Sequence, residues 1–322
     1  MKTHFRLRSE LLPCVLIACS AALLGEPVSL VYAPPEGAAF DVVERVTRVT
    51  TAGESDAVTD VRERKYRVQI VRTETGFANT ATVQALTLTR NDHQVASPVF
   101  ASMQNLELTY ELAADGSLVG ISGYEKLPEA MSERLPEGLA NTMIRLLNYD
   151  SLRHQDEMAH REVYGELPGA TLEIGVARAA ARDQALPRGG SVPLYIVESL
   201  AQPEMDAPLV LKRRYHSDAA MLAAEFEGVD EFEGVDEAAL VAAAGLLTPK
   251  LPESHESASV TGGEQTVFDP TGLLIAERTE NLEYEVALKN PDPNGMPVQH
   301  TVSETREFTV SPAVIEEEAT TE

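Results

Sequence analysis

Three patterns in this sequence have residue types and spacing that could bind a cation. Glu225 to Asp230 recurs at once as Glu231 to Asp236, and hard cations such as Ca²⁺ bind clustered carboxylates. Asn290 to Gly295 has oxygen donors at alternate positions and then glycine, like the opening of a calcium-binding loop. Glu157 and His160 have the spacing of a carboxylate–histidine pair in di-metal helix bundles.

None of these patterns completes a metal site. Phe and Val interrupt the acidic repeat, which favours a lengthened surface loop over a calcium loop. The loop that begins at Asn290 has Thr301 where its last ligand should be Glu, so a hairpin loop is the preferred interpretation. No second Glu–His pair accompanies Glu157 and His160, which favours a solvated helix surface. We therefore predict no metal ion and no cofactor.

Catalytic motifs are absent from the sequence. It contains no Gly-x-Ser-x-Gly elbow, no glycine-rich phosphate loop and no His-Glu-x-x-His helix. The histidines at 93, 216, 255 and 300 show no spacing that suggests shared ligation. We predict no catalytic residues and favour a non-enzymatic protein that binds a ligand or a partner. The alternatives are an exported hydrolase or metal-dependent enzyme with a site assembled from scattered residues, and a purely structural or interaction module.

The N-terminal segment has the layout of a secretory signal. Lys2, Arg6 and Arg8 precede an apolar run from Leu11 to Ala18, which is shorter than the roughly 20 residues of a membrane span. The run Leu16-Ile17-Ala18-Cys19 resembles the lipobox of bacterial lipoprotein precursors, in which the cysteine is lipidated and becomes the first mature residue.

This resemblance implies that residues 1–18 are a signal peptide, that a lipid on Cys19 anchors the protein to a membrane, and that residues 19–37 are a tether. Plain secretion, with cleavage after Ala22 or Ala33, is the second interpretation, and a retained anchor is the third. The protein is expected to be exported, either lipid-anchored in a bacterial cell envelope or periplasmic or extracellular. The mature domain resembles no family at the level of motifs.

Charge and cysteine content restrict the partners. The chain has 51 acidic and 26 basic residues, a formal net charge of -25 at pH 7. Such a surface repels phosphate backbones, so we predict no nucleic-acid partner. The two cysteines, Cys14 and Cys19, both lie in the signal region, so the mature domain has neither a disulfide framework nor a thiolate metal site. An apolar ligand or an envelope protein is the expected partner.

The elements that must position these residues are predicted from periodicity. Polar and apolar residues alternate between residues 40 and 123, as in strands with one buried face. Asp115-Gly116 predicts a hairpin. Apolar spacing predicts three helices, at 128–135, 139–147 and 151–164. Strands are expected at 192–200, 209–216, 219–226, 266–268, 273–277, 281–288 and 298–310, with an irregular segment at 176–191.

The predicted class is therefore α+β and β-rich: an antiparallel curved sheet, or two strand-rich halves with a helical middle segment. One β-rich domain is expected over 38–310, with a helical insertion at about 126–165. Two similar halves, 38–165 and 190–310, would reflect either a duplication or one long meander. The remainder, 311–322, is expected to be an acidic disordered tail.

A sheet covered by helices could enclose a ligand cavity. This plan is similar to that of lipoprotein carriers, in architecture only. The candidate lining residues are Leu106, Leu108, Tyr110, Leu112, Leu139, Met143 and Leu147. The alternative is that they pack together as core. The basic clusters at 62–67 and 212–214 are expected to balance acidic neighbours across the sheet.

Overall fold

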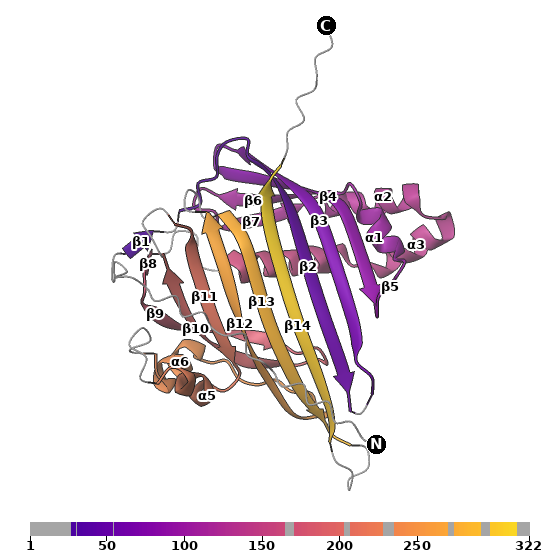
Figure 1. Cartoon of the computed structure of the whole chain (residues 1–322). Helices are drawn as coiled ribbons and strands as arrows, with labels where there is room; N and C mark the ends of the chain where they lie inside the picture. Colours follow the sequence, from indigo (N-terminus) through magenta and orange to yellow (C-terminus); the bar gives the residue numbers. More distant parts are fainter. Residues whose placement is uncertain are drawn as a thin grey trace.

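A 12-stranded antiparallel sheet is the central element of the protein in its computed structural model (Figure 1). The structure describes residues 27–29, 31–53, 55–164, 171–202, 207–227, 235–269, 274–290 and 297–313. The strand order is β7-β6-β4-β3-β2-β14-β13-β12-β11-β10-β9, with β5 paired to β4. The strands are β2 Ala39–Ala52, β3 Val58–Arg72, β4 Gly76–Arg90, β5 His93–Gln94, β6 Glu107–Ala113, β7 Leu118–Ser122, β9 Ala177–Ala185, β10 Ser191–Ala201, β11 Leu209–His216, β12 His255–Asp269, β13 Leu274–Leu288 and β14 Val298–Pro312.

The helical middle segment follows β7, and its prediction is confirmed. A short 3-10 turn, Tyr124–Lys126, leads into α2 Leu127–Arg134, α3 Glu137–Leu146 and α4 Tyr149–Tyr164. Pro128 lies in the first turn of α2, where its missing N–H costs nothing. The other helices are α1 Pro98–Met103, α5 Ala219–Glu225 and α6 Glu237–Ala244. The β-rich α+β class is likewise confirmed. No helix in the described part of the chain is long and apolar enough to span a membrane.

Two predicted elements were wrong. Residues 177–185, expected to be irregular, form β9, which pairs with β10 from Ala177 to Ala185. Residues 219–225, expected to be a strand, form α5. Its N-cap is Asp218, whose carboxylate accepts hydrogen bonds from the amides of Ala220 and Met221.

Contacts between distant strands show that the sheet curls strongly. The guanidinium of Arg182 on β9 lies 3.2 Å from Glu280 on β13, and the amide of Gln184 donates to the hydroxyl of Tyr284 at 3.1 Å. These strands are four positions apart in the sheet, so a flat sheet would separate them by about 19 Å. The face that bears these side chains is therefore concave.

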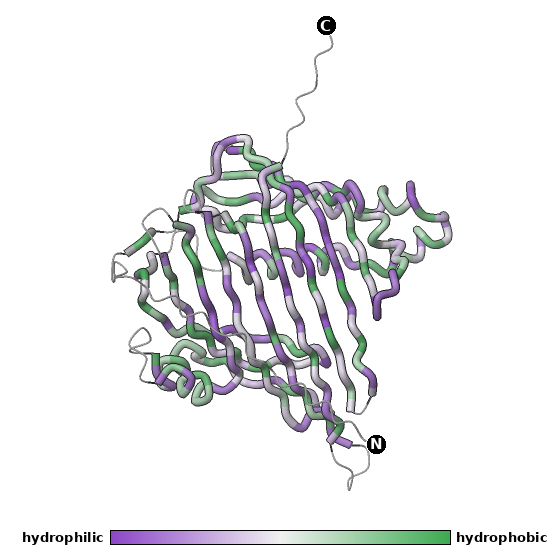
Figure 2. The backbone as a smooth tube through the Cα atoms, in the orientation of Figure 1, coloured by the Kyte–Doolittle hydropathy of each residue, from purple (hydrophilic) through white to green (hydrophobic). Residues whose placement is uncertain are grey.

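Helices cover both faces of the sheet. α4 lies across the concave face of β2, β3 and β4, as Figure 1 shows behind the long strands. α5 and α6 pack on the opposite face of β9 and β10, where Leu222 and Leu240 contact Ala177 and Val197. α2 packs against β6 through Leu127 and other residues of one apolar cluster. Polar and apolar residues alternate along the long strands (Figure 2), because successive side chains point to opposite faces.

The segment before β2 packs against the domain where it is described. Pro27–Ser29 forms β1, which pairs with β8 Thr171–Glu173 in a separate two-stranded sheet. Tyr32 is buried, with 2% of its surface exposed. The predicted signal peptide, Cys19 and the rest of the predicted tether up to residue 26 lie outside the described residues, as do residues 314–322 of the predicted tail.

Candidate binding cavity

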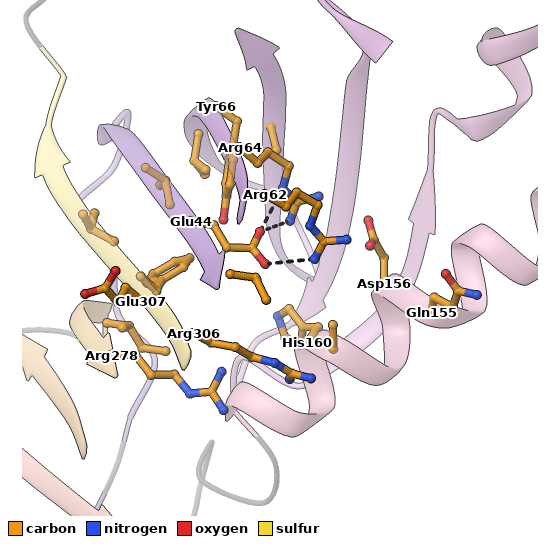
Figure 3. A pocket seen from close by; sticks show the side chains of 18 of the residues that line it. Glu44, Arg62, Arg64, Tyr66, Gln155, Asp156, His160, Arg278, Arg306 and Glu307 are labelled. Carbon is orange, nitrogen blue, oxygen red and sulfur yellow. Dashed lines mark hydrogen bonds and ion pairs between the residues drawn. The ribbon is translucent and has the colours of Figure 1, made fainter. Parts of the chain in front are cut away.

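A cavity of about 690 Å³ lies between α4 and the concave face of the sheet (Figure 3). Its walls come from β2, β3, β4 and β14, with one residue from β6, two from β13 and the cavity-facing side of α4. The volume falls within the roughly 300–1,000 Å³ of small-molecule sites. A ligand could therefore fit without rearrangement of the sheet.

One end of the cavity is apolar. Its lining includes Phe40, Val42, Val68, Ile70, Ala81, Phe308 and Val310, which are inward residues of β2, β3, β4 and β14. Tyr32 closes this end, with its ring edge-on to Phe77 at a centroid distance of 5.1 Å. The turn between β6 and β7 fixes Tyr32: Gly116 has φ +91°, and a Cβ there would lie 2.4 Å from the Tyr32 Cβ.

An unpaired polar atom of a described residue lies in this apolar end. The side-chain amide of Asn79 donates to the Tyr32 hydroxyl at 2.7 Å. The Asn79 Oδ1 atom is buried and has no hydrogen-bond partner among the described residues. It is therefore available to a hydrogen-bond donor of a ligand or to a water molecule.

The other end of the cavity is charged. Asp60 on β3 lies opposite Arg48 on β2 and Arg90 on β4, and Arg62 is two residues further along β3. Arg90 holds Asp60 through two hydrogen bonds, of 2.7 and 3.0 Å. Figure 3 shows Arg62 and Arg64 both directed at Glu44; the closest N–O distances are 4.0 Å from Arg62 and 2.9 Å from Arg64.

α4 contributes an aromatic stack and a carboxylate. The imidazole of His160 lies between the rings of Tyr110 and Tyr164, at centroid distances of 6.0 and 4.8 Å. Burial, with a smaller effect from the charge of Arg161, lowers the pKa of His160 to about 4, so the ring is neutral at pH 7. Asp156 accepts hydrogen bonds from the hydroxyls of Tyr110 at 3.2 Å and Tyr124 at 2.5 Å.

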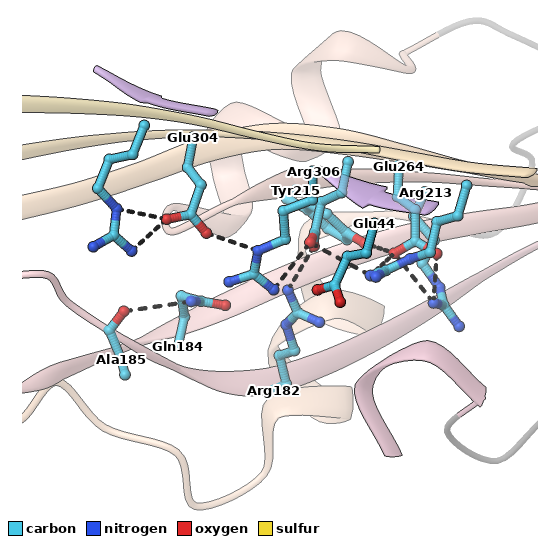
Figure 4. Close-up of polar contacts among 12 residues, drawn as sticks. Glu44, Arg182, Gln184, Ala185, Arg213, Tyr215, Glu264, Glu304 and Arg306 are labelled. Atoms are coloured by element: carbon cyan, nitrogen blue, oxygen red, sulfur yellow. Dashed lines mark hydrogen bonds and ion pairs between the residues drawn. The ribbon is translucent and has the colours of Figure 1, made fainter. Parts of the chain in front are cut away.

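A row of charged residues, whose glutamates are buried, continues from the cavity across the concave face (Figure 4). Directly opposed residues on six strands form the row: Arg178, Glu198, Arg213, Glu264, Glu280 and Arg306. The adjacent carboxylates Glu264 and Glu280 are bridged by Arg278, at 3.1 and 3.4 Å. Arg306 links Glu280 to Glu304, which also pairs with Arg48 at the cavity. The cavity wall is thus fixed by ion pairs that reach the far edge of the sheet.

The seven predicted lining residues lie in different places. Tyr110 lines the cavity. Leu106 and Leu108 are buried in the cluster beneath α2, against which Met143 and Leu147 also pack. Leu112 packs with Tyr32, and Leu139 on α3 is 38% exposed.

The candidate cation sites are placed only in part. Residues 228–234 of the acidic repeat and residues 291–296 of the second loop lie outside the described residues. Glu157 lies on α4 beside Arg153 and His154, with N–O distances of 3.8 and 3.9 Å. The described residues contain no group of three or more His, Cys, Asp or Glu side chains that could hold a metal ion.

That the arginines and the α4 residues form one site was not predicted from the sequence. The basic clusters were predicted to balance acidic neighbours, and the pairs Arg64 with Glu44, Arg67 with Asp41 and Arg213 with Glu198 confirm this. A usable signal was the alternation on β2 and β3, which places charged residues on the same face as Val42 and Tyr66.

The similarity of this chain to known proteins is distant and structural. No protein-family model and no curated protein matches the chain. A structure of lipovitellin, described for its lipid–protein interactions, has a TM-score of 0.40 and 6% identity and covers 88% of this chain. This chain spans 26% of that lipovitellin chain.

Two further structures are less similar. DynF, from the dynemicin biosynthesis pathway of Micromonospora chersina, has a TM-score of 0.18 and 9% identity. The match covers 90% of this chain and 87% of the DynF chain. OccK2 (OpdF) of Pseudomonas aeruginosa has a TM-score of 0.21 and 6% identity. The match covers 87% of this chain and 100% of the OccK2 chain.

Proposed function

We propose that this protein is a non-enzymatic binding protein that holds an elongated amphipathic small molecule in the cavity beneath α4. The observation that supports this is the graded polarity of the cavity wall. Along β2 the inward residues run from Phe40 and Val42 to Glu44 and Arg48, and along β3 from Ile70 and Val68 to Arg62 and Asp60. Phe40 and Arg48 are eight residues apart, a span of about 26 Å in a strand.

The chemistry of the lining favours binding over catalysis. The lining residues that the structure describes include no serine, threonine, cysteine or lysine, the usual side-chain nucleophiles. His160 is held between two tyrosine rings, and Asp156 is engaged by two tyrosine hydroxyls. These groups position α4 and are not directed at one reacting atom.

Fluorescence titration with the neutral apolar probe N-phenyl-1-naphthylamine tests this function. We expect saturable binding to the full chain, and a loss of about tenfold or more in affinity in Ala81→Phe, whose ring would occupy the apolar end. Thr87→Phe is the matched control, since it adds the same ring to the opposite face of β4. No binding to the wild type, or equal binding to Ala81→Phe, would contradict the proposal.

We further propose that the protein is exported and anchored by a lipid on Cys19. The basic head, the short apolar run and the lipobox-like sequence before Cys19 support this. Expression in a bacterium, followed by mass spectrometry of the membrane fraction, should give a mature N-terminus at a diacylated Cys19. Cys19→Ser should release the chain from membranes, while Cys14→Ser should leave the anchor intact. An unmodified mature N-terminus beyond Cys19 would eliminate the anchor.

A further inference from the structure

We infer that the ligand of this cavity is a single-chain amphiphile with an anionic head group, and that Arg62 binds that head. This inference rests on the proposed function. It specifies the orientation of the ligand. The hydrocarbon tail of the ligand lies at the apolar end, near Tyr32 and Phe40, and its head group lies at the end of the cavity that Arg48, Arg62 and Arg90 surround.

The charged end is basic although the protein is acidic. The whole chain has 51 acidic and 26 basic residues. Around Asp60, however, three arginines converge, two as direct cross-strand neighbours and Arg62 on the same face of β3. Because the rest of the molecule repels anions, such a cluster of positive charges is a place where a negatively charged group is attracted.

Arg62 is the arginine with the weakest protein contact in this group. Arg90 makes two short hydrogen bonds to Asp60, and Arg48 donates to Glu304 from its Nε atom at 2.8 Å. Among the described residues, the ion pair of Arg62 is with Glu44, at 4.0 Å, which is beyond hydrogen-bond distance.

Glu44 forms a closer ion pair with a different arginine, Arg64. Its Oε2 atom accepts a hydrogen bond from the Nε of Arg64 at 2.9 Å. Two guanidinium groups therefore share one carboxylate, and Arg62 has the longer contact with it. The Arg62 side chain is 53% exposed and lines the cavity, so its planar fork is accessible to a ligand.

The chemistry that fits this fork is a carboxylate or a phosphate. Guanidinium groups bind both through paired N–H donors, and such charge-assisted bonds are about twice as strong as neutral ones. Asp156, the carboxylate that α4 contributes, accepts hydrogen bonds from Tyr110 and Tyr124 through its Oδ2 atom.

Competition against N-phenyl-1-naphthylamine tests this assignment. Dodecanoate, dodecyl phosphate, dodecanol and dodecyltrimethylammonium share one chain and differ in the head group, and each is used below its critical micelle concentration. We expect dodecanoate or dodecyl phosphate to displace the probe at concentrations about tenfold lower than dodecanol. One charge-assisted hydrogen bond is strong enough to produce about a tenfold difference in affinity. The comparison of the two anions identifies a fatty acid or a phosphorylated lipid as the source.

Arg62→Gln provides the second arm. It should abolish the preference for anions, and circular dichroism shows whether the variant is folded. Arg67→Gln is the matched control, because Arg67 lies on the opposite face of β3 and pairs with Asp41. Equal displacement by dodecanol and dodecanoate, a preference for the ammonium head, or an unchanged preference in Arg62→Gln would overturn the inference. In each of these cases probe binding would leave the proposed function standing, whereas failure of the probe to bind would remove both.

Discussion

Glu264 is a carboxylate that keeps its charge although its side chain is fully buried. It accepts hydrogen bonds from the Tyr215 hydroxyl at 2.6 Å, from the Thr266 hydroxyl at 2.7 Å and from Arg278 at 3.1 Å. Burial by itself would raise the pKa of Glu264, but Arg278 and Arg213 outweigh it and lower the pKa to about 2. At neutral pH the group is therefore ionised and holds two arginines in place.

Glu264→Gln should destabilise the protein by about 3–5 kcal/mol, because it removes one of the two carboxylates that Arg213 and Arg278 each contact in the buried row. Urea unfolding followed by circular dichroism measures the change. Asp183→Asn is the control: it breaks the exposed ion pair with Lys250, 3.3 Å long, and should cost no more than about 1 kcal/mol. A cost for Glu264→Gln as small as that of the control would show that the row contributes little.

The same residue predicts a pH dependence. The folded-state pKa of Glu264 is depressed, so its contribution to stability is complete above the ordinary pKa of the group and is lost as the pH falls through that value towards 2. Glu264→Gln should therefore lose less stability than the wild type over this acidic range. A parallel decline in both proteins would contradict the pKa of Glu264 described here.

At the scale of elements, α4 is held on the sheet by a neutral histidine between two aromatic rings. The unfolded chain binds a proton at His160 below its ordinary pKa of 6.5, whereas the folded chain does so only near 4. Stability from this site is therefore present above pH 6.5 and declines as the pH falls from 6.5 to 4. Each unit of difference between the pKa values of the folded and unfolded chain corresponds to about 1.4 kcal/mol of folding stability, and partial solvent access to His160 reduces that figure.

His160→Phe should keep the stack with Tyr110 and Tyr164 and remove this decline. The measurement is the free energy of unfolding at several pH values between 4 and 7. His154→Phe is the control on the same helix, since the His154 side chain is 71% exposed, and it should retain the wild-type slope. If His160→Phe shows the same slope as the wild type, His160 is not the group that titrates.

The elements also show where local patterns predict structure and where they do not. β6 and the hairpin after it were predictable, because Leu106 to Leu112 alternate and Asp115-Gly116 supplies the turn. β9 was not, because alanine and arginine dominate it and its inward residues include Arg178 and Arg182, which face buried carboxylates. Pairing with β10 overrides this weak propensity. α5 had a usable signal in Asp218, its N-cap.

At the scale of the whole molecule, the sequence predicted the fold class better than the site. Alternation shows that Tyr66 and Tyr110 point to a buried face, but which segment covers that face depends on the curl of the sheet and on the path of α4. Leu108 and Tyr110 share one face of β6, yet Leu108 is covered by α2 whereas Tyr110 lines the cavity beneath α4. No spacing within β6 distinguishes the two positions.

The pairing of β2 with β14 has a consequence for how the chain can fold. The first and last long strands are neighbours along their length, with Phe40 opposite Pro312 and Ala52 opposite His300. The strands from β2 to β7 and those from β9 to β13 each form by pairing with strands close in sequence, apart from the helical insertions. β14 is synthesised last and inserts between β2 and β13. Until it does, the β2–β7 and β9–β13 half-sheets present unpaired strand edges. Pairing β14 with β2 closes the long loop of chain between them, and this closure is expected to be the slow step of folding.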